Sequence, residues 1–131
     1  MSRVITFGTF DVFHVGHLRI LQRAKQEGDH LIVGVSSDDL NISKKGRAPV
    51  YNTRDRIEII KAIGIVDEVF TEESLELKRH YIQQHRAEKL VMGDDWQGKF
   101  DEFNDICDVV YLPRTPSVST TEVIEVIKRT R

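Results

Sequence analysis

The sequence predicts an α/β fold, in which one doubly wound domain has a parallel sheet of about five strands covered by helices on both faces. Three observations lead to this prediction. Short β-branched runs recur along the chain, stretches with helical spacing separate them, and 131 residues with 40% hydrophobic side chains suit one domain over residues 1–131. No internal repeat and no linker rich in Pro, Gly or Ser divides the chain.

Five short apolar runs are predicted to be strands. Each is rich in Val, Ile, Leu or aromatic residues and is bounded by polar or turn residues. The runs are 4–7, 31–35, 68–70, 89–92 and 109–112. Strands that are apolar at nearly every position are typical of a sheet that is buried on both faces, and such sheets are parallel.

Helical spacing of apolar residues between these runs predicts the crossover helices. The spaced positions are Leu18, Leu21 and Ala24; Ile57, Ile60 and Ile63; and a stretch from Leu75 or Lys78 through Tyr81 and Ile82. A last helix is indicated by the capping-box pattern of residues 119–122, ahead of Val123, Ile124 and Ile127. The alternation predicts a Rossmann-like arrangement.

Charge and hydropathy exclude several classes of function. The chain has 19 basic and 21 acidic side chains, a net charge of −2, which argues against a general nucleic-acid coat. No signal peptide and no apolar run of membrane-spanning length is recognisable. The single cysteine, Cys107, has no partner within the chain for a disulfide. We therefore expect a cytoplasmic protein that binds neither nucleic acid nor membrane.

Three loops are predicted to form the ligand site. In a doubly wound sheet, ligands bind beyond the carboxyl ends of the strands, where the strand order reverses. The loops in that position are 8–17 after the first strand, 93–99 after the fourth and 113–121 after the fifth. Most of the polar chemistry of the sequence lies in these loops.

A pair of histidines in the first loop indicates a phosphate site. His14 and His17 are three residues apart where a strand passes into a helix, and Gly16 between them lets a ligand approach the backbone. The amides at the start of the helix favour an anion, and a phosphate chain fits. Two alternatives are a shared zinc ion, for which no third ligand is evident, and an ordinary polar helix cap.

Two motifs give the chain a resemblance to a known family. The segment 14–17 after 8–11 resembles the H-x-G-H signature of the nucleotidyltransferase superfamily, in its cytidylyltransferase branch. The segment 114–121 is similar to the second signature of that branch, R-T-x-G-I-S-T-T. Within the branch, the short chain and the segment 92–101 look most like the glycerol-3-phosphate cytidylyltransferases. The resemblance covers essentially the whole chain.

The resemblance implies a reaction in which CTP and sn-glycerol 3-phosphate give CDP-glycerol and pyrophosphate by in-line attack on the α-phosphorus. The attacking phosphate is already an anion, so the site needs no general base and should be rich in positive donors. The resemblance also implies Mg²⁺ held mainly by the CTP phosphates, a homodimer, and a product used for teichoic acid or capsule biosynthesis.

The residues expected to act follow from these motifs. His14, His17, Lys44 and Arg114 are the candidate catalytic residues, and Lys44, in a basic loop, also binds the acceptor together with Lys78. Candidate nucleotide-binding residues, besides the histidines and Arg114, are Thr9, Phe10, Asp11, Gly16, Arg56, Gly93, Asp95, Trp96, Thr115, Ser119, Thr120 and Thr121.

Several of these residues have plainer alternatives. Lys44 and Lys78 are alternatively solvated lysines, Arg56 an exposed helical arginine, and Trp96 a packing residue. Asp11 is expected to orient the first loop. Asp95 is the expected contact to the cytosine amino group, or else part of a turn.

Three positions depart from the family pattern. Ser117 stands where the second signature has glycine, Gly64 where relatives have an arginine tied to the subunit contact, and Gly46 where they often have a second lysine. Another acceptor stays open, because Lys44 and Lys78 are expected to contact only its phosphate: ethanolamine phosphate, choline phosphate or a sugar phosphate. A non-catalytic nucleotide-binding module is the alternative of a different class.

Overall fold

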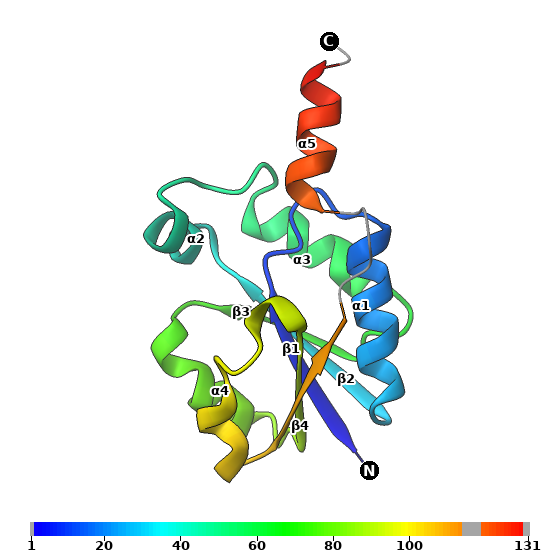
Figure 1. The fold of residues 1–131 in the computed structure, drawn as a ribbon, viewed down its shortest axis with the longest axis vertical. Helices are drawn as coiled ribbons and strands as arrows, with labels where there is room; N and C mark the ends of the chain where they lie inside the picture. Colours follow the sequence, from blue (N-terminus) through cyan, green and yellow to red (C-terminus); the bar gives the residue numbers. More distant parts are fainter. Residues whose placement is uncertain (1, 114–118, 130–131) are drawn as a thin grey trace.

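The computed structural model describes residues 2–113 and 119–129 (Figure 1). Its five strands form one sheet in the order β3-β2-β1-β4-β5, and every neighbouring pair is parallel. The strands are β1 (Arg3–Gly8), β2 (His30–Ser36), β3 (Glu68–Glu72), β4 (Lys89–Gly93) and β5 (Asp108–Leu112). The doubly wound parallel sheet is confirmed, and all five apolar runs lie in strands.

The helices of the described chain connect the strands and follow the last one. They are α1 (Val15–Gln26), α2 (Asp38–Lys45), α3 (Thr53–Lys61), α4 (Lys78–Gln84) and α5 (Thr120–Arg129), with 3₁₀ turns at Leu75–Leu77, Asp94–Trp96 and Asp101–Asp105. α3 ends at Lys61, so Ile63, which the spacing placed in that helix, lies beyond it.

The helix α2 is absent from the sequence prediction, and the prediction that Lys44 lies in a loop is wrong. Ser37 caps the helix by accepting from the amide of Leu40, and Gly46 ends it in the left-handed conformation, at φ 76°. The helix has only eight residues, and Leu40 is its one buried apolar side chain, so the apolar period is too weak to detect. Glycine at position 46 is therefore explained by the end of a helix.

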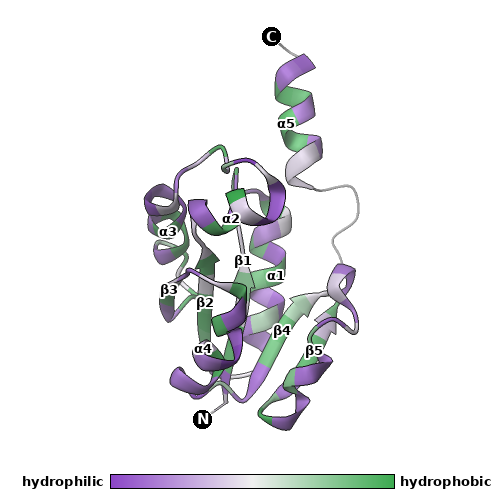
Figure 2. Ribbon diagram, turned by 90° about the vertical axis from the view of Figure 1, so that its left-hand side faces the viewer, coloured by the Kyte–Doolittle hydropathy of each residue, from purple (hydrophilic) through white to green (hydrophobic). Residues whose placement is uncertain are grey.

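Two cores lie on opposite faces of the sheet. On one face, Leu21 and Ala24 of α1 and Ile60 of α3 pack with alternate strand residues such as Val4 and Val33. On the other face, α4 and the turn at 101–105 pack over the remaining strand residues, including Ile5 and Phe7. Figure 2 shows the hydrophobic residues concentrated along the strands. This arrangement leaves the carboxyl edge of the sheet open for a site.

The strand order reverses between β1 and β4, which are neighbours in the sheet. The first loop and the 3₁₀ turn at Asp94–Trp96 therefore meet at the switch point. α5 extends away from the sheet, with its first residue near the start of α1 (Figure 1). In the described residues, no helix is long and apolar enough to span a membrane.

Candidate active site

A pocket at the carboxyl edge of the sheet brings all three predicted loops together. Its volume is about 240 Å³. It is lined by His14, Gly16, His17, Ile20, Arg23, Gly93, Asp95, Pro113, Ser119 and Thr120. We call this the histidine pocket. Of the candidate site residues, the pocket contains both histidines, Gly16, Gly93, Asp95, Ser119 and Thr120.

The two histidines are stacked at the start of α1, with ring centroids 3.8 Å apart and planes inclined by 23°. The Nδ1 atom of His14 accepts from the amide of Gly16 at 3.1 Å, and the Nδ1 atom of His17 accepts from the amide of His14 at 3.2 Å. The pair is thus a reciprocal helix cap made of imidazoles. The cap and the phosphate interpretations are compatible, because capping uses only the Nδ1 atoms.

The capping bonds determine which ring nitrogens can donate. An Nδ1 atom that accepts from an amide carries no proton, so each neutral ring has its proton on Nε2. Burial lowers the pKa of His17 to about 4, with a further lowering by His14 that Asp11 opposes. Burial also lowers the pKa of His14. At neutral pH, the pair therefore presents two neutral Nε2–H donors to the pocket.

Both Nε2 donors converge on the first residue of α5. The Oγ1 atom of Thr120 lies 3.2 Å from Nε2 of His14 and 3.4 Å from Nε2 of His17. The same hydroxyl donates to the carbonyl of Asp11 at 3.3 Å. Ser119 caps α5 by accepting from the amide of Glu122. An oxygen is thus already held where two donors and a helix N-terminus meet.

The first loop has an unusual backbone on either side of Asp11. Phe10 and Val12 have φ values of 54° and 46°, which are unfavourable for residues other than glycine and most unfavourable for β-branched valine. The carboxylate of Asp11 accepts from the amides of Val50 and Tyr51 at 2.7 and 2.9 Å. Asp11 therefore ties the first loop to the segment before α3, as expected of a residue that orients the loop.

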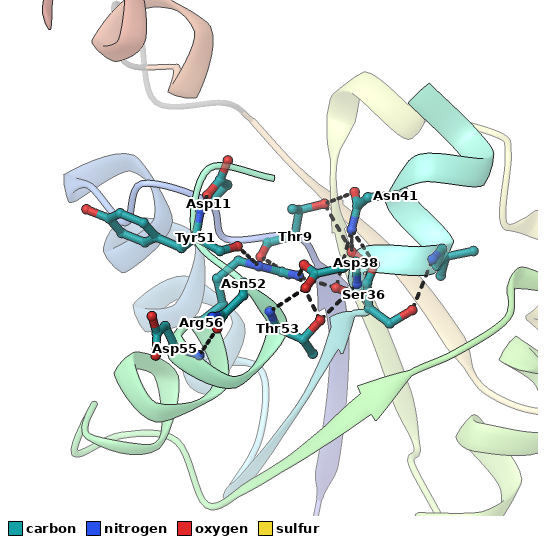
Figure 3. A network of polar contacts seen from close by, with 12 residues as sticks. Thr9, Asp11, Ser36, Asp38, Asn41, Tyr51, Asn52, Thr53, Asp55 and Arg56 are labelled. Atoms are coloured by element: carbon teal, nitrogen blue, oxygen red, sulfur yellow. Dashed lines mark hydrogen bonds and ion pairs between the residues drawn. The ribbon is translucent and has the colours of Figure 1, made fainter. Parts of the chain in front are cut away.

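Arg56 is the centre of a buried group that we call the Arg56 network (Figure 3), made up of Thr9, Ser36, Asp38, Tyr51, Thr53 and Arg56. Its Nε and Nη1 atoms donate to three carbonyls, those of Tyr51 at 2.9 Å, Thr9 at 2.9 Å and Ser36 at 2.7 Å. Its Nη2 atom donates to Asp38 at 2.8 Å and to Thr53 at 3.4 Å.

These contacts correct the expectation of an exposed Arg56 and show which oxygens its donors bind. The side chain is fully buried, so it is not an exposed helical arginine. A guanidinium has five N–H donors, and all five have protein acceptors here. In this structure Arg56 has no donor left for a phosphate. It instead holds the first loop, the start of α2 and the segment before α3 together.

Lys44 and Lys78 both lie outside the lining of the histidine pocket. Lys78 is not an exposed lysine, because it is buried and its Nζ atom is 2.7 Å from Oε2 of Glu72. Lys44 is exposed in the last turn of α2. Burial lowers the pKa of both lysines, and the charge of Glu72 opposes that effect in each case.

The remaining candidates have different surroundings. Phe10 is buried with its ring edge toward His17, at 5.5 Å between centroids, and Thr9 bonds Ser36 and Asn41. Trp96 is 44% exposed and packs on Phe100, outside the pocket lining. Thr121 also lies outside the lining. Arg114, Thr115 and Ser117 are outside the described residues, so their predicted places stay predictions.

Sequence reasoning missed two lining residues on α1, Ile20 and Arg23. The guanidinium of Arg23 donates to the carbonyl of Pro113 at 2.5 Å. The helical period, which places both residues one or two turns after His17, was the only available signal. Within the described residues, no group of three or more His, Cys, Asp or Glu side chains is arranged to hold a metal ion.

The chain is similar to known proteins over nearly its whole length. Residues 5–126 match the family model described as Cytidylyltransferase-like. The chain is 48% identical to a glycerol-3-phosphate cytidylyltransferase of Bacillus subtilis (strain 168), over 97% of this chain and 98% of that protein. It is 40% identical to the enzyme of that name from Staphylococcus aureus (strain NCTC 8325 / PS 47), over 94% and 92%.

A solved structure shares the fold. The lipopolysaccharide core biosynthesis protein of Thermoplasma volcanium GSS1 superimposes with a TM-score of 0.74 and 22% sequence identity, over 88% of this chain and 98% of that one. At this level of identity the likeness concerns the fold alone.

Proposed function

The chain belongs to the cytidylyltransferase-like family, and from this premise we propose that it transfers the cytidylyl group of CTP to sn-glycerol 3-phosphate, giving CDP-glycerol and pyrophosphate. Relatives that carry the name of this activity match nearly the whole chain, which supports the choice of acceptor. The observation that carries the proposal is the convergence of two Nε2 donors on one oxygen position at the start of α5.

In the proposed reaction, an oxygen of the acceptor phosphate attacks the α-phosphorus of CTP. The bond from that phosphorus to the bridging oxygen breaks, and pyrophosphate leaves with the electron pair. The nucleophile is already an anion, so no residue has to remove a proton. The chain's residues are left with two tasks, which are to align two anions and to stabilise the charge that develops during transfer.

The histidine pair suits the second task. A phosphate oxygen of the nucleotide takes the place of the Thr120 hydroxyl as acceptor of both Nε2–H bonds. The capping bonds hold the rings in place beforehand, so no reorganisation is needed during transfer. The negative triphosphate favours the charged form of an imidazole, but a second proton could bind only at Nδ1, which accepts the capping bond, so both rings act as neutral Nε2–H donors.

We propose Mg²⁺ as the cofactor, which would be held mainly by the phosphates of the nucleotide and would supply positive charge for the pyrophosphate. The donor set fits this arrangement, because Asp95 is the only carboxylate in the described lining of the pocket. We also propose a homodimer that acts in the cytoplasm, where CTP is made, and whose product supplies a glycerol phosphate polymer such as teichoic acid or a capsule. Light scattering of the purified protein tests the dimer.

The proposal is tested by pyrophosphate release with CTP or ATP against a panel of acceptors. The panel contains sn-glycerol 3-phosphate, ethanolamine phosphate, choline phosphate and a sugar phosphate. We expect pyrophosphate release only when CTP is combined with sn-glycerol 3-phosphate. Turnover with a different member of the panel, and none with sn-glycerol 3-phosphate, would identify that compound as the acceptor. Tight CTP binding without any product would identify the chain as a nucleotide-binding module.

A further inference from the structure

A buried ion pair lies at the carboxyl end of β3, outside the histidine pocket. Glu72 is the last residue of β3 and Lys78 is the first residue of α4. Their side chains are 2% and 6% exposed, and the distance from Nζ to Oε2 is 2.7 Å. The pair thus places two opposite charges almost wholly out of water at the edge of the sheet where ligands bind.

Aromatic rings surround the buried ammonium group. The Nζ atom of Lys78 lies 3.8 Å from the ring centroid of Phe7 and 5.2 Å from that of Phe100. An apolar side chain would fill this site well, and replacing a buried ion pair by apolar residues is often neutral or stabilising. Stability of the fold therefore does not explain why the site holds a lysine and a glutamate.

Lys44, in the last turn of α2, is the second lysine expected to bind the acceptor. Its charge interacts with those of the pair, because Glu72 raises the pKa of Lys44 and Lys78 lowers it. The main chain strengthens the connection, because the amide of Ser37, the N-cap of α2, donates to the carbonyl of Glu72 at 2.9 Å. Two lysines and one glutamate leave a net charge of +1, suited to a phosphate monoester.

We propose that Glu72 is a positioning residue for the acceptor: it holds the ammonium group of Lys78 in place beside Lys44, so that both lysines bind the phosphate of the phosphorylated alcohol. This inference rests on the proposed function. Glu72 itself touches no substrate. Without its carboxylate, the ammonium of Lys78 would be a buried charge held only by ring faces, and it would move or lose its proton.

The test compares Glu72→Gln, Glu72→Asp, Lys78→Met and the double variant Glu72→Gln/Lys78→Met. For each protein, kcat, the KM for sn-glycerol 3-phosphate, the KM for CTP and the free energy of unfolding in urea are measured. We expect Glu72→Gln to raise the acceptor KM about tenfold or more, with the CTP KM changed less than about twofold. Glu72→Asp keeps the charge and is expected to restore part of the acceptor affinity.

The double variant separates positioning from a structural role. It removes both buried charges, so it is expected to regain most of the stability that either single variant loses, while its acceptor KM stays high. A stable double variant with the wild-type acceptor KM would overturn the proposal, and so would equal increases in both KM values for Glu72→Gln. If Glu72→Gln fails to fold, Glu72→Asp and the double variant still decide the question.

A matched control breaks another ion pair at the opposite edge of the sheet. Lys89, the first residue of β4, pairs with Glu27 at 3.5 Å, so Glu27→Gln removes one carboxylate far from the ligand edge. Its acceptor KM should equal that of the wild type. Failure of the proposed function would look different, because the wild-type protein itself would then give no product with sn-glycerol 3-phosphate.

Discussion

The histidine pocket and the Arg56 network are built on the same first loop, yet they differ in what their donors bind. The Nε2 atoms of His14 and His17 share one hydroxyl at the wall of an open pocket. The donors of Arg56 all bind the protein's own oxygens, mostly main-chain carbonyls, in the interior. Charge alone would favour Arg56 as the phosphate ligand. The partners that a donor already has, more than its charge, therefore decide whether it can bind a ligand.

The largest effect is expected for Arg56, and it tests the structural role of the Arg56 network. Arg56→Met removes a cation that joins three segments, and takes one donor each from Asp38 and from the carbonyls of Thr9, Ser36 and Tyr51. We expect a loss of about 3–5 kcal/mol in the free energy of unfolding, measured in urea. Arg54→Met is the control, because Arg54 is the exposed neighbour on α3, with only a 3.8 Å pair to Glu58. A fully stable Arg56→Met protein with only a raised CTP KM would show that Arg56 binds phosphate.

The second prediction concerns His17 in the histidine pocket. His17→Ala removes one Nε2 donor from the point where charge develops, so kcat is expected to fall about 10²–10³-fold while the CTP KM changes little. Steady-state kinetics and calorimetry with CTP measure the two quantities. His80→Ala, at an exposed position on α4, should leave both unchanged. Equal losses in turnover and CTP affinity would contradict a role in the transition state.

A third prediction uses the neutral state of the pair. Because the pKa of His17 is lowered to about 4 in the folded protein and is near 6.5 in the unfolded chain, the unfolded chain binds more protons between these values. Stability is therefore present above pH 6.5 and is lost as the pH falls toward 4, by an amount on the order of 3 kcal/mol. Urea unfolding at several pH values measures it. His17→Gln should flatten this dependence, and an unchanged slope would assign it to other groups.

The smallest effect is expected at Val12, in the first loop, which the histidine pocket and the Arg56 network share. Val12→Asn places a residue that tolerates positive φ where a β-branched residue now has φ 46°, and a gain of up to about 1 kcal/mol in stability is expected. Thermal and urea unfolding measure it. Val15→Asn, at an exposed position in α1, is the control and should give no gain. A clear loss for Val12→Asn would mean that the side-chain packing of Val12 outweighs the strain of its backbone.

Most of the fold was predictable because it depends on local patterns. The strands are continuous apolar runs, and the signature around His14 and His17 identifies the loop that lines the pocket. The burial of Arg56 was not predictable, because its main acceptors are main-chain carbonyls, which every residue has. The left-handed backbone of Val12 was also hidden, since valine ordinarily signals extended structure. The pairing of Lys78 with Glu72 depends on how α4 lies against β3, a tertiary contact without a local signal.

The contact between His14 and Thr120 joins residues 106 positions apart in the chain. The strands of the sheet can therefore form from residues 3–112, whereas the pocket is complete only when α5 brings the Thr120 hydroxyl to both imidazoles. Partially synthesised copies should not sequester nucleotide. Removal of α5 by a protease should therefore weaken nucleotide binding.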